Sequence, residues 1–194
     1  MISIHKKQGG TSLKHALVVG GTGMLCNVSL WLAGQADHVS IIARNAEKMD
    51  ACISRAADRS RITPVLTDYA DSNALREHLK KLVGQHGPVD LAVAWIHSYA
   101  DHALATISNV FSQNSCQWEL YHVLGSSRNP DELLNVFAGL KNCIYHQIQL
   151  GFLLENHQSR WLTNEEISAG VIEAIQSGKK RHIVGQLEPW DKRP

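Results

Sequence analysis

Three glycines near the start of the chain, Gly20, Gly21 and Gly23, are the residues whose type and spacing point most directly to chemistry. They follow an apolar run at residues 16–19 and precede apolar residues that recur at helical spacing over residues 24–32. Strand, glycine turn and helix form the unit that binds the pyrophosphate of a dinucleotide. Without Cβ atoms, such a turn brings backbone N–H groups against the phosphates, and the positive end of the helix dipole points at them. The sequence therefore predicts a phosphate-binding turn.

The turn departs from the usual G-x-G-x-x-G spacing at its last position, Cys26, where a glycine normally allows close helix–strand packing. A tight turn without a ligand is the alternative interpretation. The cysteines are far apart and form no C-x-x-C pair: Cys26, Cys52, Cys116 and Cys143. Because the chain shows no export signal, we expect reduced thiols in a cytoplasmic protein.

The next apolar run, residues 39–43, ends on Arg44. Folds that bind NAD commonly carry an acidic residue at this position for the ribose 2′-hydroxyl, whereas an arginine suits a 2′-phosphate. Lys48 adds a second nearby cation, and Asn45 can cap the following helix. The sequence therefore favours NADP(H) over NAD(H), with a solvated arginine at a strand end as the alternative.

Polar residues also follow the third and fourth expected strands, at residues 62–66 and 89–96. Asp68 can accept a hydrogen bond from an adenine amino group or cap backbone N–H groups, and the sequence leaves both roles open. A polar cluster stands where ligands bind in parallel sheets: His97, Ser98, Tyr99, Asp101 and His102. Its spacing matches no metal-binding motif, so we expect no metal.

Strands and helices continue to alternate along the chain. Pro64 predicts that the third strand lies near a sheet edge, and Gly84 is expected to end the helix that follows it. Further strands are expected at residues 118–124, 143–150 and 182–184. About seven strands alternating with helices predict an α/β fold, a Rossmann-type doubly wound parallel sheet with helices on both faces.

The strand at residues 143–150 has one polar face, which carries Tyr145, Gln147 and Gln149. A fully buried parallel strand would be apolar on both faces. We therefore expect this face to line a cofactor cleft, a water-filled groove or a partner subunit. Residues 151–161 are expected to form a loop before a helix that opens with the capping box Thr163-x-x-Glu166.

Composition limits the partners. The chain has 194 residues and a formal net charge of +1, which argues against nucleic acid or an anionic membrane as the main partner. No apolar run approaches the roughly 18 residues needed to span a bilayer. We expect a mobile tail at residues 1–13 and a single dinucleotide-binding domain at residues 14–194.

With these elements placed, the chain resembles the short-chain dehydrogenase/reductase family over residues 14–186. The similar segments are VVGGTGML, IIARN, TDYAD, VLGSS, LGFLLE and the closing RWLTNEEISAGVIEAI. The resemblance implies a homodimer and a nicotinamide cofactor over Gly20, Gly21, Thr22, Gly23, Met24, Leu25, Arg44, Asn45, Asp68, Tyr69, Ala94, Trp95, Ile96, Ser126, Leu150 and Phe152.

The family's catalytic groups are a serine and a Tyr-x-x-x-Lys pair. Ser126 or Ser127 matches the serine, but Tyr145 is followed four residues later by a glutamine. Carbonyl reduction needs an acid at the substrate oxygen, and glutamine cannot supply the charge that makes the tyrosine a better acid. The candidate acid–base residues are therefore Ser126, Ser127, His97 and Tyr145.

Three hypotheses follow. The first is an NADP(H)-dependent oxidoreductase that transfers hydride to or from a small carbonyl or alcohol with non-standard acid–base residues. The second is a non-enzymatic NADP-binding sensor or regulatory protein that has lost the Tyr/Lys pair and acts on a protein partner. The third is a scaffold that no longer binds a cofactor, for which Cys26 is the one positive sign.

Overall fold

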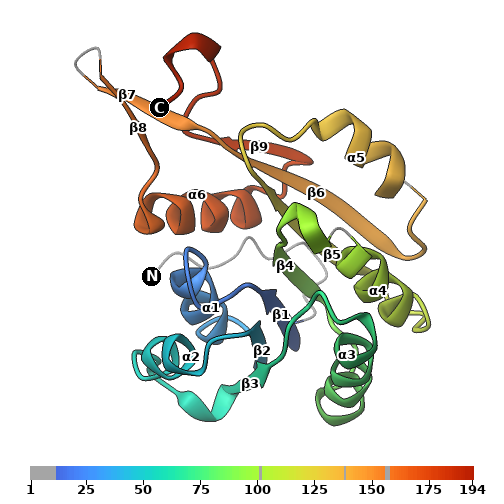
Figure 1. The fold of residues 1–194 in the computed structure, drawn as a ribbon. Helices are drawn as coiled ribbons and strands as arrows, with labels where there is room; N and C mark the ends of the chain where they lie inside the picture. The colour runs from blue at the N-terminus through green and yellow to red at the C-terminus, as the bar shows by residue number, and fades with distance from the viewer. Residues whose placement is uncertain (1–11, 101, 138, 156–157) are drawn as a thin grey trace.

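The computed structural model describes residues 12–100, 102–137, 139–155 and 158–194. Seven parallel strands form one sheet in the order β3-β2-β1-β4-β5-β6-β9, which confirms the predicted doubly wound topology (Figure 1). The strands are β1 His15–Val19, β2 His38–Ala43, β3 Ile62–Leu66, β4 Leu91–Trp95, β5 Trp118–Leu124, β6 Cys143–Leu150 and β9 Arg181–Val184. The strand order reverses beside β1, and the carboxyl ends of the strands meet along one edge.

Helices cover both faces of this sheet, as predicted (Figure 1). They are α1 Cys26–Ala33, α2 Ala46–Ile53, α3 Ser72–His86, α4 His102–Phe111, α5 Pro130–Phe137 and α6 Asn164–Ser177. Buried residues of α1, α2 and α6 form one core with the sheet, and those of α3, α4 and α5 form the other. Within the described residues, no helix has the length and apolar character needed to cross a membrane.

The N-terminal prediction falls mostly on residues 1–11, which lie outside the described residues. The positions that follow are fixed by the core. Leu13 packs against the α1 side of the sheet, and its carbonyl accepts a hydrogen bond from Asp37. The backbone N–H of Lys14 donates to Asp90 at 2.8 Å.

The predicted end of one helix differs from the structure. Helix α3 continues through Gly84 and ends at Gly87, whose φ of +83° suits a residue without a side chain. A glycine inside a helix costs only about 1 kcal/mol, less than the buried leucines of α3 that precede Gly84 supply. By contrast, β3 lies at the sheet edge, as Pro64 predicted.

The predicted loop at residues 151–161 is instead an antiparallel hairpin, β7 Phe152–Glu155 with β8 Gln158–Trp161. Its base is anchored because the Phe152 side chain is fully buried and its backbone exchanges hydrogen bonds with Gln186. The sequence gives no strong alternation here, so the hairpin depends on this anchor to the C-terminal segment.

The polar face of β6 is buried, and the expectation of a cleft, groove or partner surface there is wrong. The Gln147 amide donates to the Pro130 carbonyl at 2.6 Å, and the Gln149 amide donates to the Arg128 carbonyl at 3.0 Å. These bonds hold the segment after β5 and the start of α5 against the sheet. Backbone carbonyls thus satisfy the amide N–H groups of this face, whereas the Gln147 side-chain oxygen is buried without a hydrogen-bond partner among the described residues.

Candidate functional site

The glycine turn is packed tightly on its inner side and open on its outer side. Gly20 has a φ of +76°, and a Cβ atom there would lie 2.9 Å from the Trp95 carbonyl oxygen. A Cβ atom at Gly21 would lie 2.7 Å from the hydroxyl of Ser29. At Gly23, no atom lies within 4 Å of the Cβ position, so a ligand can approach the backbone there.

Helix α1 begins directly behind the turn. Its N-cap residue, Leu25, makes no side-chain hydrogen bond to the first turn of the helix. The close approach of helix and turn is achieved at Ser29, whose hydroxyl donates to the Gly21 carbonyl at 2.9 Å. On the outer side, Ser168 of α6 donates to the Met24 carbonyl at 2.6 Å and holds the turn in place. Such a helix start offers N–H groups to an anion.

Cys26 and Cys52 form a disulfide between α1 and α2, so the expectation of reduced thiols is wrong for this pair. Their Cα atoms lie 5.9 Å apart because α2 packs beside the start of α1. The 26-residue separation matches no sequence motif that would have revealed the pairing. Cys116 and Cys143 are free thiols.

A cleft of about 330 Å³ lies beside the turn, between α1, α2 and the start of α6. Both disulfide cysteines line it, together with Gly23, Lys48 and Arg55. This cleft was not predicted. The described residues contain no group of three or more His, Cys, Asp or Glu side chains that could hold a metal ion, and Asp101 of the polar cluster lies outside them.

Arg44 follows β2 and is about half exposed. Its guanidinium lies 3.4 Å from the Asp68 carboxylate and 5.8 Å from the centre of the Tyr99 ring. The second Asp68 oxygen accepts a hydrogen bond from the Ala70 backbone N–H at 2.9 Å, so of the two roles considered the structure shows the capping one. Asn45 caps α2, as predicted, by accepting from the Lys48 backbone N–H.

Aromatic rings form a row after β4. The His97 and Tyr99 rings stack with centres 5.7 Å apart, and Tyr99 stacks with Tyr69 at 6.3 Å. The Tyr69 hydroxyl accepts from the His97 backbone N–H and from Tyr99, and burial, with the Tyr99 hydrogen bond, raises the pKa of Tyr69 to about 12. The indole of Trp95 reaches from Gly20 to Gly125 across the ends of β1, β4 and β5.

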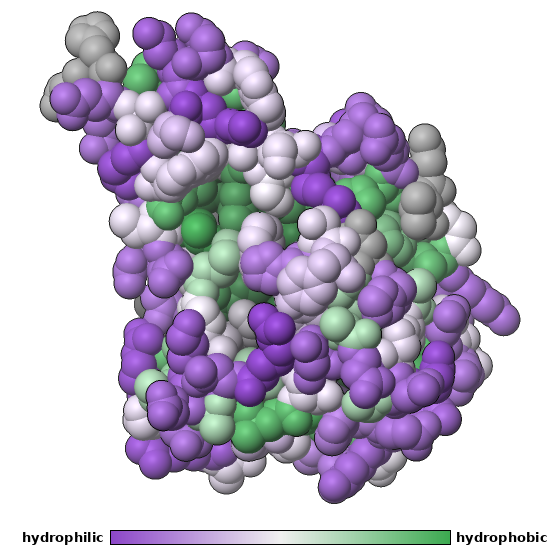
Figure 2. Space-filling model, viewed as in Figure 1, coloured by the Kyte–Doolittle hydropathy of each residue, from purple (hydrophilic) through white to green (hydrophobic). Residues whose placement is uncertain are grey.

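The predicted cofactor residues divide into exposed and buried groups. Arg44, Asn45, Asp68 and Gly23 are exposed. Trp95 and Ser126 are half-buried, and five others at the strand ends are buried and form the floor of the edge: Tyr69, Ala94, Ile96, Leu150 and Phe152. Figure 2 shows this face notched between the lobe that carries the β7–β8 hairpin and the lobe that carries α5, with hydrophobic atoms along the notch.

The structure separates Tyr145 from the other three candidate acid–base residues. His97 and Ser127 are exposed after β4 and β5, and the Ser126 hydroxyl lies 3.5 Å from Arg193 of the C-terminal segment. Tyr145 lies within β6 on the α5 side, where its hydroxyl is hydrogen-bonded to His122 Nδ1 at 2.9 Å. Burial raises the pKa of Tyr145 to about 12 and lowers that of His122 to about 3. Tyr145 is therefore unavailable to a ligand at the edge, contrary to the expectation from the sequence.

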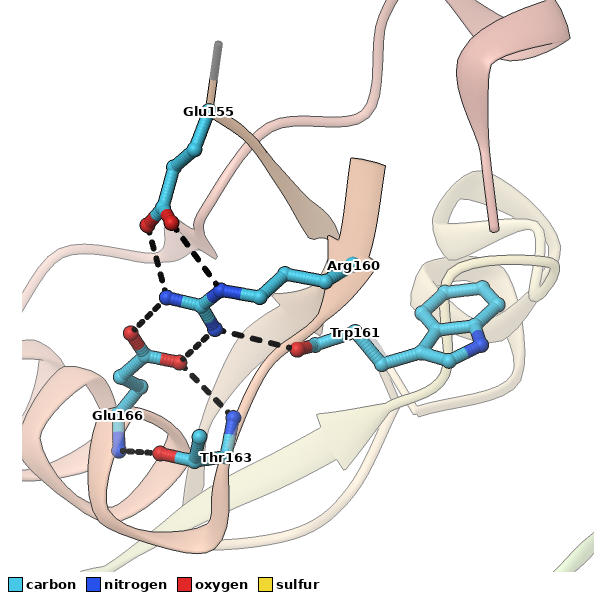
Figure 3. Close-up of polar contacts among 5 residues, drawn as sticks. All are labelled: Glu155, Arg160, Trp161, Thr163 and Glu166. Carbon is cyan, nitrogen blue, oxygen red and sulfur yellow. Dashed lines mark hydrogen bonds and ion pairs between the residues drawn. The ribbon is translucent and has the colours of Figure 1, made fainter. Parts of the chain in front are cut away.

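An ion-pair network joins the hairpin to α6 (Figure 3). Arg160 donates to both Glu166 oxygens at 2.9 Å and to Glu155 at 2.8 Å. Thr163 completes the predicted capping box with Glu166. The hydrogen bonds from Arg160 and from the Thr163 backbone lower the pKa of Glu166 to about 2. The capping box was visible in the sequence, whereas the role of Arg160 depends on the hairpin that places it there.

No family model and no curated protein matches the sequence. Solved structures match along most of the chain. A short-chain dehydrogenase/reductase from Serratia marcescens is 16% identical, with a TM-score of 0.70, over 93% of this chain and 99% of that one. A short-chain dehydrogenase from Burkholderia cenocepacia in complex with NADP is 14% identical, with a TM-score of 0.68, over 90% and 97%.

A third similar structure is YwfH, described as an NADPH-dependent reductase involved in bacilysin biosynthesis. It is 14% identical, with a TM-score of 0.69, over 90% of this chain and 100% of that one. At this level of identity the likeness concerns the fold. The chain therefore has the fold of the short-chain dehydrogenase/reductases, as its sequence motifs predicted.

Proposed function

We propose that this protein binds NADP(H) along the carboxyl edge of the sheet and transfers hydride between that cofactor and a small carbonyl or alcohol. The observation that carries the proposal is the glycine turn, whose outer glycine is open and whose following helix has no side-chain cap. Such a turn accepts a pyrophosphate without rearrangement. The fold supports the proposal, since one similar structure is an NADP complex and another is NADPH-dependent.

Different residues would hold different parts of the cofactor. The backbone of Thr22 and Gly23 and the start of α1 would hold the pyrophosphate. Arg44, held by exposed contacts to the Asp68 carboxylate and the Tyr99 ring, can turn toward a 2′-phosphate, with Lys48 on the next helix. The bound cofactor supplies the hydride. Of the candidate proton donors, His97 is exposed at the edge and stacks on Tyr99 of the aromatic row. We therefore assign His97 the role of donating a proton to the substrate oxygen.

Calorimetric titration with NADPH and NADH tests cofactor binding. NADPH should bind more tightly than NADH, and Arg44→Ala should weaken NADPH binding about 100-fold, or about 2.7 kcal/mol, because a charge-assisted contact to the 2′-phosphate is lost. NADH binding should change little. Arg76→Ala, on α3, is the matched control and should change neither. Failure of the wild-type protein to bind either nucleotide would refute the proposal.

The second candidate function is a non-enzymatic NADP-binding sensor. The burial of Tyr145 favours it, because the one tyrosine that sequence reasoning assigned to catalysis lies in the core. Turnover of NADPH with a panel of small aldehydes and ketones separates the two candidates. Tight NADPH binding without NADPH oxidation on any of them would support the sensor and contradict the oxidoreductase.

A further inference from the structure

The Cys26–Cys52 disulfide has surroundings that favour one of its two sulfurs as a thiolate. Cys26 is the first residue of α1, where the N–H groups and the helix dipole stabilise negative charge. The Arg55 guanidinium lies 3.5 Å from Cys26 Sγ and is held there by a 2.6 Å hydrogen bond to the Asn27 side chain. Cys52, in the last turn of α2, instead faces the carbonyl oxygens of Gly21 and Cys26 at 3.8 Å, which do not stabilise negative charge on sulfur.

The disulfide lies at the floor of a cleft, although its side chains are mostly buried: Cys26 is 7% exposed and Cys52 is 2% exposed. Both cysteines line the 330 Å³ cleft beside the glycine turn, whose charged lining residues are two cations, Lys48 and Arg55, and one carboxylate, Glu165, so the lining is net positive. The positive charge of such a cleft attracts a small thiolate reagent. Thiol–disulfide exchange proceeds by attack of that thiolate on a disulfide sulfur.

From these observations, we propose that Cys26 and Cys52 are a redox-active pair that exchanges with dithiols through this cleft. A thiolate of the dithiol attacks Cys52 Sγ, forms a mixed disulfide and expels Cys26 as the thiolate that α1 and Arg55 stabilise. The second thiol of the reagent then attacks its own sulfur in the mixed disulfide and releases Cys52, which takes up a proton. The protein disulfide gains two electrons, the dithiol becomes a disulfide, and one proton passes to solvent while Cys26 stays ionised.

Reduction has a consequence at the glycine turn. It removes the covalent tie between α1 and α2 and places a negative charge at the start of α1, where a phosphate would bind. The consequence rests on the proposed function: the oxidised protein should bind NADPH about tenfold more tightly than the reduced one. By thermodynamic reciprocity, NADPH should make the disulfide harder to reduce by the same factor.

Thiol mapping tests the pair without any nucleotide. The wild-type protein is equilibrated with glutathione disulfide or with reduced dithiothreitol, trapped with an alkylating reagent and mapped by mass spectrometry. Cys26 and Cys52 should be protected together in the first sample and labelled together in the second, while Cys116 is labelled in the reduced sample as an internal control. Labelling of Cys26 and Cys52 after equilibration with glutathione disulfide would overturn the proposal.

The pH dependence of alkylation tests the role of Arg55. In the reduced protein, the midpoint for Cys26 should rise by about one pH unit in Arg55→Gln, which corresponds to a tenfold loss of thiolate. Arg59→Gln, whose guanidinium contacts the Ser54 carbonyl, is the control and should leave the midpoint unchanged. Equal midpoints in Arg55→Gln and wild type would overturn the assignment of Cys26 as the stabilised thiolate.

Calorimetry with NADPH on the oxidised and reduced protein completes the test. Equal affinities would refute the link between the pair and the nucleotide site. Absence of binding in both states would refute the proposed function, whereas the thiol measurements would still decide whether the pair is redox-active.

Discussion

Two histidine–tyrosine pairs occupy neighbouring parts of the same sheet in opposite environments. His97 and Tyr99 follow β4 at the carboxyl edge, are exposed and stack ring on ring. His122 and Tyr145 lie within β5 and β6, are buried and share a hydrogen bond of 2.9 Å. The residue types are the same, but only the first pair can meet a ligand. Position along a strand, not residue type, decides which pair is available for chemistry.

The largest expected effect is on turnover. His97→Asn should lower NADPH-dependent carbonyl reduction about 100-fold or more, because a positioned acid contributes about 10²–10⁴-fold. Thermal stability should stay close to wild type, since the side chain is exposed. Steady-state kinetics and a melting curve on the same preparation measure both. Turnover at the wild-type rate in His97→Asn would contradict the assignment of His97 as the proton donor.

The buried pair should behave in the opposite way. Tyr145→Phe leaves the ring of His122 without its partner and should lower the free energy of unfolding by about 1–3 kcal/mol. NADPH affinity should not change. Tyr99→Phe is the matched control, because Tyr99 is 55% exposed and its loss of a hydroxyl should cost little. Urea denaturation of both variants makes the comparison, and a weaker affinity in Tyr145→Phe would contradict it.

The buried His122 should make the folded protein less stable as the pH falls. Burial lowers the pKa of His122 to about 3, so the unfolded chain takes up a proton near pH 6.5 before the folded protein does. Stability should therefore fall as the pH drops below about 6.5, by up to about 1.4 kcal/mol per pH unit for this group. His15, which is buried, and His38, which is half-buried, add to the same trend, because burial also lowers their pKa values. Unfolding at pH 7, 6 and 5 should show a flatter profile for His122→Asn than for His97→Asn.

The smallest expected effect lies in the network of Figure 3. The pKa of Glu166 is lowered to about 2. The contribution of this carboxylate to the free energy of unfolding is therefore present above about pH 4.5 and is lost as the pH falls through about 2. Glu166→Gln should lower the melting temperature slightly at pH 7, because the network is exposed to solvent. The difference from wild type should vanish at about pH 2 if both proteins remain folded, and a constant difference would contradict the ion-pair explanation.

The sequence predicted the sheet because its signals are local. The apolar runs, the glycine turn and the Thr163 capping box each depend on a few adjacent residues. Pro64 correctly placed β3 at an edge, since a missing N–H has the same consequence in any fold. The prediction that Gly84 ends its helix was wrong, because the small cost of a glycine is outweighed by the buried leucines that precede it in α3.

The site was less predictable because its contacts join distant segments. The disulfide spans 26 residues, and the cleft that it lines needs α6 as a wall. The alternation in β6 was read correctly, but its polar face is covered by the segment after β5, whose carbonyls are acceptors that no periodicity reveals. Tyr145 was misplaced for the same reason.

The hydrogen bond from Ser168 to the Met24 carbonyl has a consequence during protein synthesis. Its two residues are separated by 144 positions, so the turn leaves the ribosome long before the helix that supports it. Nascent chains that end before α6 expose the apolar side of α1 and carry an unsupported turn. Nucleotide would then bind with full affinity only to chains in which α6 has been synthesised and packed against the turn.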